Sequence, residues 1–140
     1  MTPAIQALKK LGFAHSVHRY EVSGDEEVTY GEAVAAAIGA DPATVFKTLI
    51  AQLNTGELVV AIVPVTSTLD LRALAAAADA KSAAMAAPVA AERSSGYVTG
   101  GISPFGQRKK LRTFVDGSAE RFGTVFDSAG RRGLQMSLAT

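Results

Sequence analysis

Residues 45–65 read VFKTLIAQLNTGELVVAIVPV, and this stretch decides the fold. Two runs rich in apolar and β-branched residues, 45–53 and 58–63, flank Asn54-Thr55-Gly56, a combination typical of a tight turn between strands. The pattern therefore predicts a β-hairpin. Neither run alternates regularly between apolar and polar residues.

Signals of further helices and strands lie on both sides of this hairpin. Thr2-Pro3 is typical of a helix start, and Thr29-Tyr30-Gly31-Glu32 has the Ser/Thr-x-x-Glu form of a capping box. Helices are predicted at 3–11, 30–38, 70–78 and 88–94, with a short turn after Asp41-Pro42. Strands are predicted at 13–22, 81–85, 112–115, 124–127 and 133–138. Short helices among such strands predict a single α+β domain over residues 1–140, built around a mixed sheet or small barrel.

Composition excludes several classes of protein. The 140 residues include no cysteine, which excludes disulfides, thiolate metal sites and a catalytic thiol of the chain's own. The net charge of +1 gives no overall field of the kind that attracts nucleic acid. The sequence starts without a signal-peptide pattern and has no apolar run of the roughly 20 residues that span a bilayer. We expect a cytoplasmic protein with no membrane partner, no metal and no cofactor.

Lys47 is the most informative single residue. On a strand it shares a face with Val45, Leu49 and Ala51, all apolar, because alternate side chains point the same way. Such a lysine either extends its amine to solvent at the sheet edge or points into a pocket with a partner. In the second case it is a cation suited to a phosphate, a carboxylate or a developing oxyanion. The pattern leaves both interpretations open.

The second notable feature is the glycine-rich stretch 97–106, YVTGGISPFG, followed by the basic run Arg108-Lys109-Lys110. Paired glycines allow successive N–H groups to point into one concavity and bind an anion, although a simple connecting loop has the same composition. The stretch has neither the P-loop pattern nor the dinucleotide-binding spacing. Basic runs usually decorate a solvated surface, but this one stands close enough to the loop to contact phosphates outside a pocket.

Several motifs together resemble the YbaK/EbsC family, the free-standing relatives of the editing domain of bacterial prolyl-tRNA synthetases. The resemblance covers almost the whole chain. It is carried by 18–21 (HRYE), 45–49 (VFKTL), 69–71 (LDL), 93–97 (RSSGY), 100–106 (GGISPFG) and 131–134 (RRGL). The glycine loop together with an upstream lysine on a Val-x-Lys-Thr-Leu strand is the most specific combination.

The resemblance implies a mixed, barrel-like β-sheet flanked by short helices, and release of a wrong amino acid from tRNA, foremost cysteine from proline tRNA. It implies that Lys47 is essential, that Gly100 and Gly101 donate N–H groups to an oxyanion, and that prolyl-tRNA synthetase is a partner. It places eight further residues against the terminal adenosine and its amino acid: Tyr20, Tyr30, Ile102, Ser103, Pro104, Phe105, Ser128 and Gln135. Arg108, Lys109 and Lys110 would contact the tRNA backbone. In the mechanism proposed for the family, the thiol of the bound cysteine attacks its own ester, so no protein nucleophile is needed.

One departure from the family pattern keeps alternatives open. Gln135 stands where the best-known members carry an aspartate expected to meet the ammonium group of the substrate, and a neutral amide cannot balance that charge. Removal of alanine by water is the nearest alternative to cysteine removal. A non-catalytic module that binds the tRNA acceptor end or a synthetase is the alternative from another class.

Overall fold

The fold is given by a computed structural model, which describes residues 2–21, 30–98, 101–131 and 133–139. Its helices are α1 (Pro3–Leu11), α2 (Tyr30–Ile38), α3 (Leu71–Ala77) and α4 (Pro88–Ser95), with 3-10 turns η1 (Pro42–Thr44) and η2 (Gly117–Arg121). Its strands are β1 (His15–Arg19), β2 (Phe46–Leu53), β3 (Leu58–Pro64), β4 (Ala83–Met85), β5 (Thr113–Val115), β6 (Thr124–Ser128) and β7 (Leu134–Ala139). The predicted helices and strands are confirmed to within a few residues, whereas η2 was not predicted.

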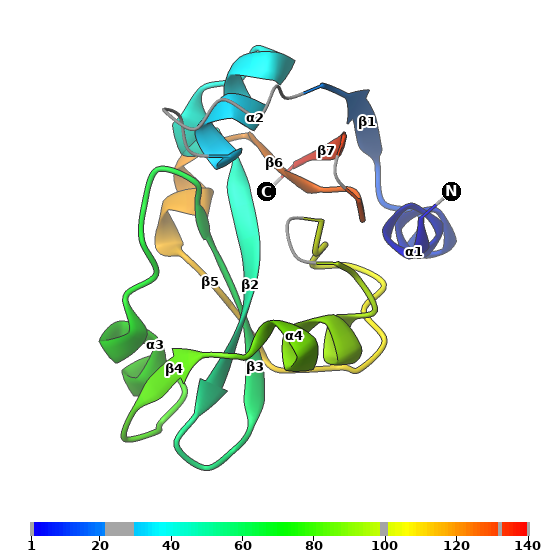
Figure 1. Cartoon of the computed structure of the whole chain (residues 1–140). Coiled ribbons are helices and arrows are strands. Elements are labelled where there is room, and N and C mark those ends of the chain that lie inside the picture. The colour runs from blue at the N-terminus through cyan, green and yellow to red at the C-terminus, as the bar shows by residue number, and fades with distance from the viewer. Residues whose placement is uncertain (1, 22–29, 99–100, 132, 140) are drawn as a thin grey trace.

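The strands form two sheets (Figure 1). One has four strands in the order β4-β2-β3-β5, and the other has three in the order β1-β7-β6. β2 and β3 form the predicted antiparallel hairpin, with Lys47 opposite Val63, while β3 and β5 run parallel. An isolated parallel bridge between Val45 and Phe126 joins the sheets. The mixed α+β class is confirmed, but within the described residues the two sheets do not close into a barrel.

The two faces of the hairpin are buried against different partners. Ala51, Val59 and Ala61 pack against Leu74 and Ala78, at and just after α3. On the other face lies a second apolar cluster that reaches α1, α4 and the loop after it, made of Ala4, Phe46, Ile50, Val60, Ile62, Ala91, Tyr97 and Ile102. The hairpin is therefore covered on both sides, which explains why its strands lack a regular polar alternation.

Helix α1 holds together two segments that are far apart in the sequence. The side chain of Thr2 caps the helix by accepting from the Ile5 N–H, and its hydroxyl donates to the Ala129 carbonyl in the turn between β6 and β7. Gly106 adopts a positive φ of 66°, and a Cβ there would lie 2.6 Å from the Pro3 carbonyl oxygen. Only glycine allows so close an approach, so the 101–106 loop is packed directly on the start of α1.

None of the helices in the described part of the chain is long and apolar enough to span a membrane.

Candidate functional site

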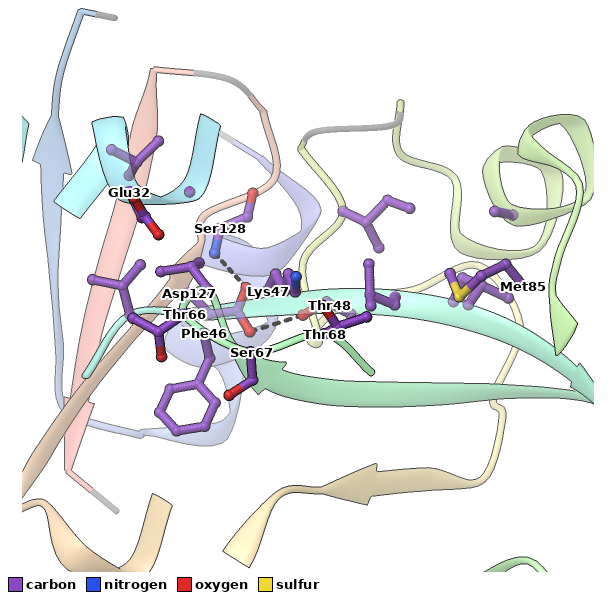
Figure 2. Close-up of a pocket in the computed structure, with 18 of the residues that line it drawn as sticks. Glu32, Phe46, Lys47, Thr48, Thr66, Ser67, Thr68, Met85, Asp127 and Ser128 are labelled. Atoms are coloured by element: carbon purple, nitrogen blue, oxygen red, sulfur yellow. Dashed lines mark hydrogen bonds between the residues drawn. The ribbon is translucent and has the colours of Figure 1, made fainter. Parts of the chain in front are cut away.

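A cleft of about 680 Å³ lies along the N-terminal half of β2. β4 pairs with β2 only at Ala51–Leu53, so it leaves the edge of residues 46–49 open. Side chains from α2, both sheets, the 65–68 connection and the start of α4 close the space around that edge (Figure 2). The lining residues are Gly31, Glu32, Val34, Val45, Phe46, Lys47, Thr48, Leu49, Ile50, Val65, Thr66, Ser67, Thr68, Met85, Ala86, Pro88, Ala91, Ile102, Asp127, Ser128 and Gln135.

Gly31 lets α2 come close enough to form one wall of the cleft. A Cβ at this position would lie 2.5 Å from the Cβ of Val65, in the segment that follows β3. Any larger residue would push the helix away from that segment. Glu32, the next residue, is exposed and brings a carboxylate to the wall.

Lys47 lines the cleft and is half-buried, so the pocket interpretation of this lysine is the one the structure supports. It forms no salt bridge with any residue that the structure describes. Figure 2 labels Lys47, Thr48 and Asp127 among the side chains that line the cleft. A cation in this position, with no salt bridge to the described residues, suits an anionic or polar part of a ligand.

Asp127 is a buried carboxyl group at the base of the cleft, with 5% of its surface exposed. Its Oδ2 accepts from the Thr48 hydroxyl at 2.8 Å, and its Oδ1 accepts from the Ser128 N–H at 2.7 Å (Figure 2). Burial raises the pKa of Asp127 to about 8, and the two hydrogen bonds oppose that rise. The group is therefore mostly protonated at neutral pH.

Gln135 and Ser128 line the cleft from the three-stranded sheet. They lie opposite each other in the β6–β7 pairing, so their side chains share one face. The Ser128 hydroxyl accepts from the Gly130 N–H at 3.1 Å. The Gln135 Oε1 is buried with no hydrogen-bond partner among the described residues. A buried acceptor without a partner costs free energy, so this position suits a ligand that donates a hydrogen bond.

The 101–106 loop contributes less to the cleft than the sequence predicted. Gly101 is buried and its N–H donates to the Val98 carbonyl at 2.9 Å, so in this structure it is not free to bind an oxyanion. Gly100 lies outside the described residues. Of the loop, only Ile102 lines the cleft. Ser103, Pro104 and Phe105 do not, and the Phe105 carbonyl instead accepts from the Tyr97 hydroxyl at 2.7 Å.

The remaining predicted residues also lie away from the cleft or cannot be placed. Tyr20 borders a separate, more polar hollow with Arg19 and Arg131. The Tyr30 side chain lies outside the described part of the structure. Arg108, Lys109 and Lys110 are exposed after the loop, and the N–H groups of Arg108 and Lys109 donate to the carbonyls at the end of α4.

Sequence reasoning missed Asp127 and Thr48. Both lie on predicted strands, and an acidic residue directly after Val125 and Phe126 was a signal that a buried carboxyl group needed a hydrogen-bond partner. The partner is 79 residues away in the sequence, so only the packing of β6 against β2 reveals the pair. The exposed hydroxyls of Thr66, Ser67 and Thr68 also line the cleft and were not predicted to do so.

The chain is similar to known proteins in both sequence and fold. The family profile described as "aminoacyl-tRNA editing domain" matches residues 25–140. The chain is 36% identical over 120 residues to EbsC of Enterococcus faecalis strain V583, a protein assigned as a Cys-tRNA(Pro)/Cys-tRNA(Cys) deacylase, covering 86% of this chain and 73% of that one.

Two crystal structures share the fold. One is of a protein assigned as a trans-editing enzyme for prolyl-tRNA synthetase, with a TM-score of 0.82 and 19% identity, covering 99% of this chain and 88% of that one. The other is of the hypothetical protein APE2540, with a TM-score of 0.86 and 18% identity, covering 98% and 88%.

Proposed function

The chain belongs to the aminoacyl-tRNA editing domain family, and from that premise we propose that it removes cysteine from mischarged Cys-tRNA(Pro). The observation that carries the proposal is the cleft, which Lys47 lines without a salt-bridge partner in the part of the chain that the structure describes. EbsC, assigned this activity, is 36% identical to the chain over most of its length.

The cleft is suited to a reaction that needs no protein nucleophile. Among the described residues, those that line it include no histidine and no cysteine. The Thr48 hydroxyl is already committed to Asp127. A substrate that carries its own nucleophile fits such a site. The cysteine thiol attacks the ester carbonyl, the new C–S bond replaces the C–O bond to the ribose, and the thiol proton passes to the departing ribose oxygen, so that a thiolactone and free tRNA leave.

The protein would then bind and orient the substrate, and such positioning can contribute several kcal/mol to the rate. We assign Lys47 to the terminal phosphate or ribose, where a charged amine strengthens binding. Gln135 Oε1 and Ser128 face the aminoacyl group, whose ammonium protons would supply the missing hydrogen bond to Gln135. The Gly101 N–H is not included, because it is already bonded to Val98.

The decisive experiment measures loss of radiolabelled cysteine from Cys-tRNA(Pro) with wild-type protein and with Lys47→Ala. Removing the cation should lower kcat/KM by about 100-fold or more. Lys9→Ala is the matched control, because Lys9 is an exposed lysine on α1 that does not line the cleft. No lysine-dependent loss of the ester would refute the enzymatic function. A loss of kcat with unchanged KM would refute the anchoring role of Lys47 alone.

The same assay with alanine or serine on the tRNA tests the substrate. Serine presents a hydroxyl in place of the thiol and alanine has neither, so both should react at least tenfold more slowly if the thiol is the nucleophile. Equal or faster loss of alanine would instead favour hydrolytic editing by water. Binding of the acceptor end without any loss of amino acid would favour a non-catalytic module.

Selectivity for the proline tRNA would come partly from outside the cleft. We propose that the exposed run Arg108, Lys109 and Lys110 contacts the tRNA backbone, and that the protein acts in the cytoplasm beside prolyl-tRNA synthetase. Replacing all three with alanine should raise KM and flatten its dependence on salt, because fewer counterions would be released on binding. Adding the synthetase should increase discrimination between proline tRNA and other cysteine-bearing tRNAs. No effect of the synthetase would contradict the partnership.

A further inference from the structure

The cleft is assembled from side chains of both sheets. Lys47 belongs to the four-stranded sheet, whereas Ser128 and Gln135 belong to the three-stranded sheet. Among the contacts that join the sheets at this point are the backbone bridge from Val45 to Phe126 and the hydrogen bond from Thr48 to Asp127. The second lies one residue from Lys47 on β2 and one residue from Ser128 on β6.

We propose that Asp127 is a positioning residue, which acts through Thr48 to fix Lys47 at a set distance and angle from Ser128 and Gln135. The inference rests on the proposed function for its kinetic consequences. Asp127 Oδ2 holds the Thr48 hydroxyl while Oδ1 holds the Ser128 N–H, so one carboxyl group ties β2 to the start of the β6–β7 turn. The two walls of the cleft are thereby joined by a single side chain.

The burial of Asp127 favours a role in fixing the arrangement of the cleft over a role in stabilising the fold. A carboxyl group with 5% exposure loses hydration, and a well-packed apolar side chain at such a place is often neutral or stabilising. An apolar residue could fill the volume but could not hold a hydroxyl and an N–H in fixed directions. Directional hydrogen bonds specify one arrangement where apolar contacts permit several.

Asp127 is also distinct from the groups that face the ligand. Both of its oxygens are occupied by hydrogen bonds from the protein itself, in contrast to Gln135 Oε1. Its preference for the protonated form argues against use as an anion that attracts the substrate. Lys47 and Glu32 supply the charges of the cleft.

Thr48→Val is the main test, since valine keeps the shape of threonine and removes only the hydroxyl. With the tie lost, kcat for Cys-tRNA(Pro) should fall by about 10- to 100-fold while KM changes by less than about threefold, because misplacement affects the reacting geometry more than binding. Thr48→Ser restores the hydroxyl and should recover most of that turnover. Asp127→Leu should lower kcat as much as Thr48→Val does. The kcat of the double variant should be no lower than that of the less active single variant.

Leu74→Ala is the matched control for a loss of stability. Leu74 packs beside Ala51 at the far end of β2 and does not line the cleft. Measured well below its melting temperature, this variant should keep the wild-type kcat. Wild-type kcat in Thr48→Val, additive losses in the double variant, or an equal loss in Leu74→Ala would each overturn the positioning role.

A second measurement does not depend on catalysis. The rate at which an amine-reactive reagent labels Lys47, read by mass spectrometry, reports how firmly the amine is held. Thr48→Val should increase this rate at least threefold relative to Lys9 in the same molecule, and an unchanged rate would overturn the inference. If wild-type protein releases no amino acid but the labelling rate rises as expected, the proposed function fails and the structural tie remains. If the wild type is active and the labelling rate and kcat of Thr48→Val are unchanged, the inference fails alone.

Discussion

The two halves of strand β2 differ in pairing, covering and chemistry. Its last residues, Ala51–Leu53, pair with β4. Ala51 and Gln52 also pair with β3, and Ala51 and Leu53 lie in an apolar cluster with α3. Its first residues, 46–50, pair with β3 but not with β4. These residues, which include Lys47 and Thr48, line the cleft. Residues 51–53, the framing half of β2, therefore belong to the packed framework of the fold. Residues 46–50, the cleft half, line the candidate site. The candidate site lies where the pairing of β2 with β4 stops.

The largest expected effect is on stability in the framing half. Leu74→Ala should lower the free energy of unfolding by about 2–5 kcal/mol, since it removes a buried side chain and leaves a cavity beside Ala51 and Val59. Urea denaturation followed by circular dichroism measures the change. A loss below about 1 kcal/mol would mean that the cluster under α3 collapses to fill the cavity, and the contrast between the halves would weaken.

A pH-dependent effect should distinguish the cleft half. The pKa of Asp127 is raised to about 8 in the folded chain, against about 3.9 for an unperturbed aspartate. The folded state therefore binds a proton over a range in which the unfolded state has lost it. The free energy of unfolding should fall as pH rises from about 4 to about 8 and change little above that.

Asp127→Asn should remove this dependence, because the amide can hold both neighbours and does not titrate. Urea midpoints at intervals across this pH range measure it. Glu57 and Asp116 do not confound the result: their pKa values are lowered, so their contributions are lost only as pH falls below their unfolded values near 4. A wild-type midpoint that stays constant or rises over the range would show that Asp127 ionises normally.

The framing half was predictable from the sequence and the cleft half only in part. The turn at Asn54-Thr55-Gly56 and the helix starts at Thr2-Pro3 and at 70 are local signals, decided by residues within one turn of each other, and the structure confirms them. Lys47 was identified because an isolated cation on an apolar strand conflicts with its surroundings. Such a conflict is visible without knowledge of the fold.

The rest of the site depends on contacts between distant segments. The pairing of Thr48 with Asp127 requires the two sheets to meet, and no local pattern encodes that meeting. The paired glycines permit an anion-binding nest, but the Gly101 N–H turns back to Val98. Composition shows which backbone conformations are accessible, whereas packing on α1 decides which one is adopted.

A smaller effect is expected at Gln135. Gln135→Leu removes a buried acceptor that has no partner among the described residues, and this should raise the free energy of unfolding by about 1 kcal/mol. The same change should raise KM for Cys-tRNA(Pro), because the leucine cannot accept a hydrogen bond from the aminoacyl group. Urea denaturation and steady-state kinetics check the two parts. A loss of stability would mean that Gln135 has a partner in solution, and an unchanged KM would remove it from the site.

The smallest effect is expected at the far end of the hairpin, where charge is exposed to water. Arg112 donates to both carboxylate oxygens of Glu57, at 2.8 and 2.9 Å, and this contact lowers the pKa of Glu57. Solvent screens such a pair, so Glu57→Gln should shift the melting temperature far less than Leu74→Ala does. The difference from wild type should vanish in about 1 M salt, where charges are screened over roughly 3 Å. A large shift in melting temperature that persists in about 1 M salt would mean that the directional hydrogen bonds of the Arg112–Glu57 pair hold the hairpin turn. The framing half would then depend on a polar contact, as the cleft half does.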